Sequence, residues 1–248
     1  MPTRPVRRSQ VKNAAGTSID HADASAQDST KSRILDVAEH LFMEHGFEAT
    51  SLRSLTSSAG VNLAAVNYHF GSKEELFQAV LTRRLDPMNQ ERIELLAKLE
   101  KECGDRAIPC ERILAAMLVP ALRLARDERR GGKNFLRLLG RAYADPAPFI
   151  RHFLSAQYAE MIARYKEAFH RALPHLSRQE LTWRLHFVMG ALSYTLLGAD
   201  LLKLFEQVTP GLKDNDELLL QRLAPFLVAG LKAPALGNAP KLELVSGD

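Results

Sequence analysis

Three glycines divide residues 30–86 into short helical segments, and this pattern restricts the fold more than any other feature of the sequence. Apolar residues in this stretch recur at the i, i+3, i+4 and i+7 spacing of amphipathic helices, and Gly46, Gly60 and Gly71 interrupt the runs. A glycine readily adopts the left-handed backbone conformation that ends a helix. We therefore expect three short helices, followed by a fourth that begins after Gly71.

Polar residues stand where each of these helices would begin. Such side chains accept hydrogen bonds from the free N–H groups of the first helical turn. Ser72 and Glu75 have the S-x-x-E spacing of a capping box, in which each side chain caps the other residue's backbone. The predicted capping residues are Ser29 or Thr30, Thr50 or Ser51, Asn62, and Ser72.

The third predicted helix, 62–70, has one apolar face and one face of small and polar residues. At 100° per residue, Leu63, Val66 and Phe70 fall on one side, and we expect them to be buried. Alanines on the other side would let another molecule approach the backbone closely, and polar side chains would then hydrogen-bond to it. That side carries Ala64, Ala65, Tyr68 and His69, with Asn67 at its edge.

A helix, a glycine-containing turn and a second short helix form a helix-turn-helix, whose second helix enters the major groove of DNA. Asn67 suits an adenine edge, and Tyr68 and His69 suit phosphates. The helix start at Ser72 and Lys73 adds free N–H groups and a cation, which together can hold a phosphate. A catalytic or metal-binding role for His69 is disfavoured, because no carboxylate or second ligand stands at helical spacing from it.

The whole chain has the pattern of an all-α protein. After Pro87 the helical patterns become longer, and no strand-like alternation or internal repeat is present. We expect these helices at about 88–102, 110–127, 133–144, 147–172, 178–204 and 215–232. The predicted domains are a disordered basic and polar tail over 1–29, a helix-turn-helix domain over 30–86, a larger helical domain over 87–232 and a flexible tail over 233–248. The first tail is either solvated or in contact with phosphates.

Charge and composition exclude several classes of protein. The formal net charge of +4 permits an anionic partner without requiring one. The two cysteines, Cys103 and Cys110, have no nearby histidine and form no CxxC, so neither a zinc site nor a disulfide framework is expected. We see no G-x-S-x-G, phosphate loop or paired carboxylates, and we predict no catalytic residue, metal or cofactor. No apolar run approaches the roughly 20 residues of a membrane span, and no signal-peptide pattern is present, which favours the cytoplasm.

The segment "RILDVAEHLFMEHGFEATSLRSLTSSAGVNLAAVNYHFGSKEELFQAVL" resembles the DNA-binding domain of TetR-type transcriptional regulators. The resemblance lies in Ala-x-x-Leu-Phe-x-x-x-Gly-Phe, Thr-Ser-Leu-Arg and Tyr-His-Phe-Gly-Ser-Lys-Glu-Glu-Leu. Many members have an aromatic residue where Asn67 stands, so this position departs from the common pattern. The resemblance implies DNA contacts from Ser51, Arg53, Asn62, Ala64, Ala65, Asn67, Tyr68, His69 and Lys73.

Within this family, "AGVNLAAVNYHFGSK" and "WRLHFVMGALSYTL" are most similar to fatty-acid-responsive repressors of the PsrA kind. This similarity implies that the larger domain binds a small hydrophobic effector, such as a fatty acid or an acyl-CoA. Methionine and aromatic residues over 88–172 are nevertheless more typical of a core than of a pocket. We therefore assign no effector-binding residue.

The last two long helices, about 178–204 and 215–232, are apolar around most of their circumference. Leucines and a valine form one face of the first helix, and aromatic and small residues occupy its other faces. This pattern predicts either a four-helix interface in a homodimer or a purely intrachain core. The leucine and valine face of the helix at about 178–204 comprises Leu181, Leu185, Val188, Leu192 and Leu196.

Together these features predict a dimeric DNA-binding transcriptional regulator. The resemblance implies a repressor that leaves a pseudo-palindromic operator in double-stranded DNA when its effector binds. The alternatives are an activator or a regulator that needs no effector.

Overall fold

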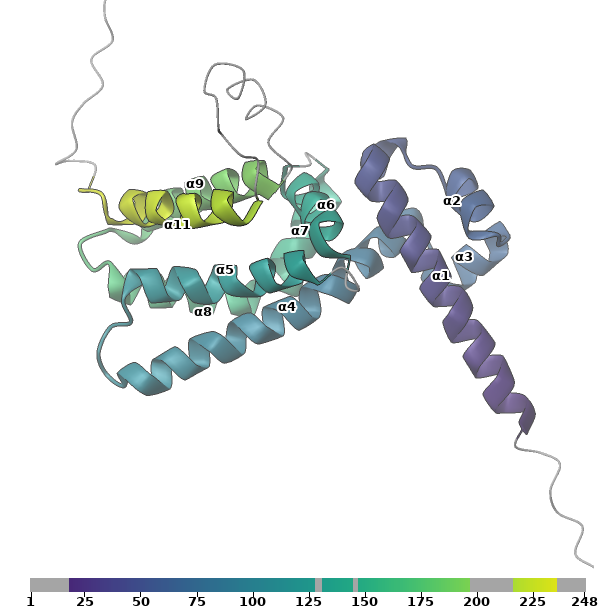
Figure 1. Cartoon of the computed structure of the whole chain (residues 1–248), viewed down its shortest axis with the longest axis horizontal. Coiled ribbons are helices and arrows are strands. Elements are labelled where there is room, and N and C mark those ends of the chain that lie inside the picture. Colours follow the sequence, from purple (N-terminus) through teal and green to yellow (C-terminus); the bar gives the residue numbers. More distant parts are fainter. Residues whose placement is uncertain (1–17, 128–130, 145–146, 197–215, 236–248) are drawn as a thin grey trace, which may run out of the picture.

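The computed structural model describes residues 18–127, 131–144, 147–196 and 216–235 (Figure 1). Every regular element in these ranges is an α-helix, which confirms the all-α prediction. The helices are α1 (Ser18–Ala49), α2 (Leu52–Ala59), α3 (Leu63–Phe70), α4 (Lys73–Cys103), α5 (Cys110–Arg126), α6 (Gly132–Ala144), α7 (Pro148–Gln157), α8 (Ala159–Ala172), α9 (Arg178–Leu196) and α11 (Asp216–Lys232).

Helix α1 begins earlier than predicted. It starts at Ser18 rather than near Thr30, so residues 18–29 are helical and not the disordered tail that we expected. Alanines and acids near the helix start favour the helix, and lengthening an existing helix avoids the cost of a new nucleus. Gln27, Asp28 and Ser29, at the end of this segment, are exposed, so they need no apolar periodicity. Residues 1–17 lie outside the described part of the chain.

The predicted break at Gly46 is present. Gly46 has a φ of 79° and a ψ of 174°, so the helical path is interrupted there, shortly before α1 ends. Thr50 then fixes the turn into α2: its buried hydroxyl donates to the carbonyl oxygens of Gly46 at 2.8 Å and Leu41 at 3.2 Å. The turn between the first two helices is therefore held from within the core.

Side-chain caps begin the next three helices, as the sequence predicts. Ser51, rather than Thr50, accepts from Ser54 N–H at 3.0 Å at the start of α2, and Asn62 accepts from Ala65 N–H at 2.8 Å at the start of α3. Ser72 caps α4 in a reciprocal capping box with Glu75. These caps set where each short helix begins.

Two glycines join these helices in conformations that other residues rarely adopt. Gly60 ends α2 with a φ of 61° and a ψ of 38°, which confirms the left-handed residue predicted there. Gly71, between α3 and α4, has a φ of 77°, and a Cβ at this position would lie 2.3 Å from Glu75 Oε2. A side chain at Gly71 would therefore collide with the capping box.

Helix α4 continues through Pro87, where we expected two separate helices. Proline removes one backbone hydrogen bond but does not end a helix whose neighbouring turns are held by packing. Leu85 and Met88, on either side, are both buried. The predicted domain boundary near residue 86 therefore lies inside a single helix, which runs from the helix-turn-helix into the C-terminal helices (Figure 1).

Two hydrophobic clusters form the core. The first joins α1–α4 to α5, α6 and α7, with Phe42, Leu55, Leu81 and Phe135 among its fully buried members. The second lies among α4, α5, α8, α9 and α11. Because the first cluster includes residues of α6 and α7, the helix-turn-helix shares its core with the following domain.

The C-terminal part differs from the prediction at one break. The helix expected over 147–172 is two helices, α7 and α8, separated at Tyr158. The Tyr158 hydroxyl donates to Asp86 Oδ1 of α4 at 2.9 Å. This buried tyrosine therefore anchors the break against α4, a contact between residues distant in sequence.

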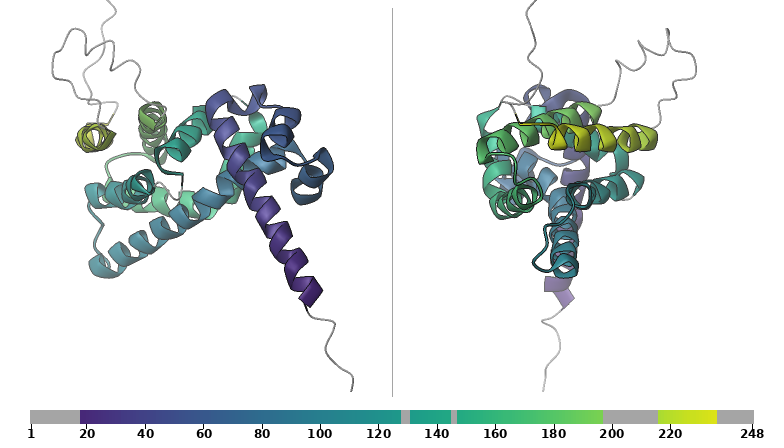
Figure 2. Two further views of the ribbon diagram at one scale, coloured as in Figure 1. Left: turned by 45° about the vertical axis from the view of Figure 1, so that its right-hand side comes forward. Right: turned by 90° about the vertical axis from the view of Figure 1, so that its left-hand side faces the viewer.

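Helices α9 and α11 pack together at the end of the molecule away from α2 and α3 (Figures 1 and 2). Their starts match the prediction closely, and residues 197–204 of the expected first helix lie outside the described ranges. Among the helices of the described residues, none has the length and hydropathy needed to span a membrane.

Candidate DNA-binding surface

The position of α3 follows from a few buried and capping residues. Val66 and Phe70 are buried in the first core cluster, and Asn62 and Gly60 set the start of the helix and the turn before it. Helix α3 lies beside α2 at the outer end of the molecule (Figure 1). This is the helix-turn-helix arrangement predicted from the glycine spacing.

The face of α3 opposite the core is open to solvent. The Tyr68 side chain is 74% exposed, and Asn67 and Ala64 are also exposed. Ala65 and His69 are half-buried, and the His69 ring lies 5.1 Å from the Tyr68 ring, centre to centre, in an edge-to-face arrangement. Small side chains and hydrogen-bonding groups therefore share one accessible surface.

The polar atoms of two predicted contact residues are already engaged in helix caps. The Ser51 hydroxyl accepts from Ser54 N–H and donates to the Ser54 hydroxyl at 3.1 Å. The Asn62 carbonyl oxygen caps α3, so its amide NH₂ is the part that remains for another molecule. Arg53, in the first turn of α2, is exposed.

Lys73 stands at the first position of α4, where backbone N–H groups are free. Its ammonium lies over the Phe47 ring at 4.3 Å from the ring centre and donates to the Glu48 carbonyl oxygen at 3.3 Å. The cation is therefore fixed beside the end of α1. A helix N-terminus with a cation is a good environment for a phosphate.

The prediction for Leu63 is wrong. We expected it to be buried with Val66 and Phe70, but its side chain is 49% exposed. The helical-wheel angle is right, but Leu63 is in the first turn of α3, where it belongs to neither the buried core cluster nor the half-buried residues that pack against it. Angle alone does not show how far a core extends along a short helix.

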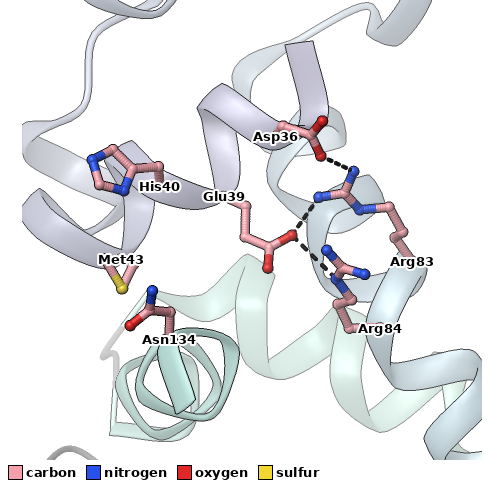
Figure 3. Close-up of a pocket in the computed structure, with 7 residues that line it drawn as sticks. All are labelled: Asp36, Glu39, His40, Met43, Arg83, Arg84 and Asn134. Atoms are coloured by element: carbon pink, nitrogen blue, oxygen red, sulfur yellow. Dashed lines mark hydrogen bonds and ion pairs between the residues drawn. The ribbon is translucent and has the colours of Figure 1, made fainter. Parts of the chain in front are cut away.

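A charged cluster joins α1 to α4 (Figure 3). Arg83 donates to Asp36 at 2.7 Å and to Glu39, and Arg84 Nε donates to Glu39 at 3.3 Å. The Glu39 carboxylate is buried between the two guanidinium groups. Met43 and Asn134, the latter from α6, line the same small hollow together with His40.

Two more contacts link the end of α1 to the C-terminal helices. Arg141 of α6 donates to the Glu44 carbonyl oxygen at 3.2 Å. The Phe149 ring of α7 lies 4.7 Å from the Phe47 ring, centre to centre. The position of α1, and with it the helix-turn-helix, is therefore tied to α4, α6 and α7.

Helix α9 buries one face and exposes another, as its composition predicts. Leu181, Val188 and Leu192 are buried, and Leu185 is half-buried. Large aromatic side chains on the other side are exposed, with Trp183 at 55% and Phe187 at 64%; Tyr194 and Phe226 of α11 are exposed as well. The predicted face residue Leu196 ends α9, and nothing is described of its side chain.

Arg184 was not singled out from the sequence, although it lies among the apolar residues of α9. Its buried guanidinium donates to the carbonyl oxygens of Leu231 at 3.0 Å, Ala233 at 2.6 Å and Pro234 at 2.7 Å, and to Glu180 at 2.8 Å. A lone arginine within an apolar helix pattern is the signal that could have identified it. This side chain caps the C-terminus of α11 and holds it against α9.

The methionine and aromatic residues of the middle helices lie mainly in the core. Phe135, Tyr158 and Tyr165 are buried, and Met117 and Phe149 are half-buried against the clusters. Within the described ranges, no group of three or more His, Cys, Asp or Glu side chains is arranged to hold a metal.

Both parts of the chain match descriptions of one family. Residues 34–80 match "Bacterial regulatory proteins, tetR family", and residues 115–230 match "Tetracyclin repressor-like, C-terminal domain". The HTH-type transcriptional repressor KstR2 of Rhodococcus jostii (strain RHA1) is 33% identical over 66 residues, which are 27% of this chain and 32% of that protein. The HTH-type transcriptional repressor ComR of Escherichia coli (strain K12) is 46% identical over 52 residues, 21% of this chain and 25% of that protein. The chain thus spans about a third or less of the length of these curated relatives.

Solved structures share the fold over most of the chain. SmeT, solved as a triclosan complex, superposes with a TM-score of 0.51 and 24% identity over 87% of this chain and all of that one. AibR, solved with isovaleryl coenzyme A and operator DNA, gives a TM-score of 0.54 and 20% identity over 83% of this chain and 99% of that one. With matches to both the N-terminal and C-terminal domains and a shared fold, the chain belongs to the tetR family of bacterial transcriptional regulators.

Proposed function

We propose that this protein is a dimeric repressor that binds a pseudo-palindromic operator in double-stranded DNA and leaves it when a small hydrophobic effector binds. The observation that carries the proposal is the exposed face of α3, where Ala64, Asn67 and Tyr68 are accessible in the second helix of a helix-turn-helix. Such a helix fits the major groove and contacts base edges from its N-terminal part. The site of action is the cytoplasm, where the operator is found.

Specific groups on this face take distinct roles in the proposal. Asn67 reads an adenine edge, because an amide can both donate to and accept from adenine. Tyr68, His69 and Lys73 hold phosphates at the rim of the groove, and Ser51 and Arg53 approach the backbone from the start of α2. Asn62, Ala64 and Ala65 lie at the N-terminal part of α3, next to the bases.

One short helix contacts too few base pairs for useful specificity, so the proposal includes a homodimer. A two-fold symmetric dimer places its reading helices in major grooves about 34–36 Å apart. The exposed aromatic residues of α9 and α11 support this, because Trp183 and Phe187 stack with ring centres 6.1 Å apart on α9, and Phe226 is exposed on α11. Arg184 of α9 holds α11, the other helix of the proposed interface, in place.

The dimer surface is tested by changing its charge. Phe187→Glu places a carboxylate in the proposed interface and should convert the protein to a monomer in sedimentation velocity runs. Ile162→Glu is the matched control, because Ile162 is an exposed aliphatic residue on a different helix, α8. A Phe187→Glu protein that still sediments as a dimer would remove α9 from the proposed interface.

The effector is proposed to be a fatty acid or an acyl-CoA, in keeping with the similarity of two segments to repressors of the PsrA kind. The fold can hold such ligands, since AibR was solved with isovaleryl coenzyme A and SmeT with triclosan. The ligand would act by binding more tightly to a conformation in which the reading helices are wrongly spaced. The contacts of α1 with Arg83, Arg141 and Phe149 are routes by which movement in the larger domain reaches α3.

The experiment has two stages. Binding-site selection on random duplex DNA gives the operator, and a two-fold symmetric consensus is expected. That duplex is then titrated in the presence of fatty acids of several chain lengths, their CoA thioesters and the corresponding alcohols, which control for detergent-like effects. Release by one acyl class supports the effector proposal, and binding unaffected by any of them favours the alternatives, an effector-independent regulator or an activator.

A further inference from the structure

Leu63 presents a large aliphatic side chain to solvent at the start of the reading helix. Its side chain is 49% exposed, while Val66 and Phe70 of the same helix are buried. Leu63 belongs neither to the buried core cluster nor to the half-buried residues that pack against that cluster. About half of this aliphatic side chain stays in water, so a large part of the stabilisation available from burying a leucine is not gained here.

The surroundings of Leu63 do not suit a protein partner. The residues beside it, Asn62 and Ala64, are exposed and are polar or small. The large exposed aromatic residues of α9 and α11 lie at the other end of the molecule (Figures 1 and 2). A single exposed leucine among such residues is too small an apolar patch for a stable protein interface.

A base edge offers Leu63 an apolar partner. In a helix-turn-helix the N-terminal residues of the second helix contact the edges of bases, and Leu63 is the first residue of α3. In the major groove the apolar group on these edges is the C5-methyl of thymine. We propose that Leu63 reads a thymine methyl group and so determines the base preference at one position of each half-site.

Asn67 supports this reading by its position. It is exposed and stands four residues after Leu63, so the two side chains are neighbours at the edge of the exposed face, about 6 Å apart along the helix axis. Asparagine suits an adenine edge. The pair would therefore favour a half-site in which a thymine and an adenine lie within one or two base pairs of each other. This inference rests on the proposed DNA-binding function of α3.

The test removes only the thymine C5-methyl group from the operator DNA. Thymines in the selected operator are replaced by deoxyuridine, one symmetric pair of positions at a time, and binding is measured by fluorescence anisotropy. At one position the wild-type protein should lose about fourfold in affinity per half-site, the value for one buried methyl group. Leu63→Ala should bind the thymine duplex more weakly and lose nothing further on deoxyuridine at that position. Ile162→Ala, at an exposed aliphatic residue of α8, is the control and should behave as wild type.

A second variant tests specificity rather than affinity. Leu63→Gln replaces the apolar side chain by an amide, and repeated selection should replace thymine at the same position by another base. The thermal unfolding of both variants should match that of the wild type, because Leu63 is outside the core. The inference fails if Leu63→Ala remains as sensitive to deoxyuridine as the wild type at every position. If the wild-type protein selects no DNA sequence at all, the proposed function fails instead.

Discussion

The Lys73 ammonium lies 4.3 Å from the centre of the Phe47 ring, above its face, and 3.3 Å from the Glu48 carbonyl oxygen. A lysine side chain on a surface normally samples many rotamers, and fixing one costs up to about 2 kcal/mol. Here the end of α1 restrains the lysine before any partner binds. The cation is thus already placed at the N-terminus of α4, and contact with a phosphate would need little further ordering.

Lys73→Met should therefore lower operator affinity mainly through charge. It keeps much of the side-chain length but removes the phosphate contact proposed for each subunit, so the slope of log K against log salt should fall by about one unit per subunit. Lys166→Met, at an exposed lysine of α8, changes net charge equally and should leave the slope unchanged. Equal slopes for the two variants would show that Lys73 holds no phosphate.

Replacing Arg184 should lower the free energy of unfolding of the protein. Arg184→Met leaves the carbonyl oxygens of Leu231, Ala233 and Pro234 without their donor inside the protein. The loss of a buried, fully hydrogen-bonded cation should reduce the free energy of unfolding by about 3–5 kcal/mol, measured by urea denaturation. The proposed dimer should also weaken, since α11 loses its anchor on α9.

Arg178→Met is the control for Arg184. Arg178 also lies on α9 and pairs with Glu167 at 3.1 Å, but its side chain is 73% exposed. An exposed pair of this kind contributes about 0–1 kcal/mol. If the two substitutions reduced stability equally, Arg184 would not be the anchor described here.

The two cysteines should react differently. Burial, with a smaller contribution from Glu111, raises the pKa of the Cys110 thiol to about 11, and Cys103 is only half-buried. Because the thiolate is the nucleophile, iodoacetamide at pH 8 should label Cys103 and spare Cys110 in the native protein. Peptide mass spectrometry measures both sites at once, and early labelling of Cys110 would contradict its buried, protonated state.

The raised pKa of Cys110 should also make the stability of the folded protein depend on pH. A thiol with a raised folded-state pKa stabilises the folded protein fully below its unfolded value of about 8.5–9. Above that pH the unfolded chain ionises first, so this contribution to stability is lost as pH rises toward 11. Cys110→Ser should give a shallower decline over this window in urea denaturation.

Local signals in the sequence predicted the helix-turn-helix well because that region is determined locally. Ser51, Asn62 and Ser72 each cap the next helix through a bond to a residue three positions on, and Gly60 has the predicted left-handed conformation. Such interactions depend only on neighbouring residues. Caps, glycine breaks and apolar spacing together therefore predicted the starts of α2, α3 and α4, with Thr50 or Ser51 left open at α2.

Where the prediction was wrong, distant contacts decided the structure. Pro87 does not end α4, because buried residues on both sides hold the helix together, and the break at Tyr158 is anchored by Asp86, 72 residues earlier. Leu63 has the wheel angle of a core residue but is half-exposed in the first turn of α3. The Tyr158–Asp86 contact is distant in sequence, and how far burial extends along a helix is set by tertiary packing, so periodicity could not reveal either.

Tyr68 offers the most direct test of whether the exposed face of α3 binds DNA. Its side chain is 74% exposed and contacts the His69 ring, so Tyr68→Ala should leave the fold and the dimer intact. Tyr68→Phe, which keeps the ring, separates the hydroxyl from the ring itself. The measurement is fluorescence anisotropy with the selected operator, alongside circular dichroism and sedimentation. We predict that Tyr68→Ala abolishes binding, a loss of about a hundredfold or more per dimer; a well-folded Tyr68→Ala dimer that binds the operator with wild-type affinity would contradict the account.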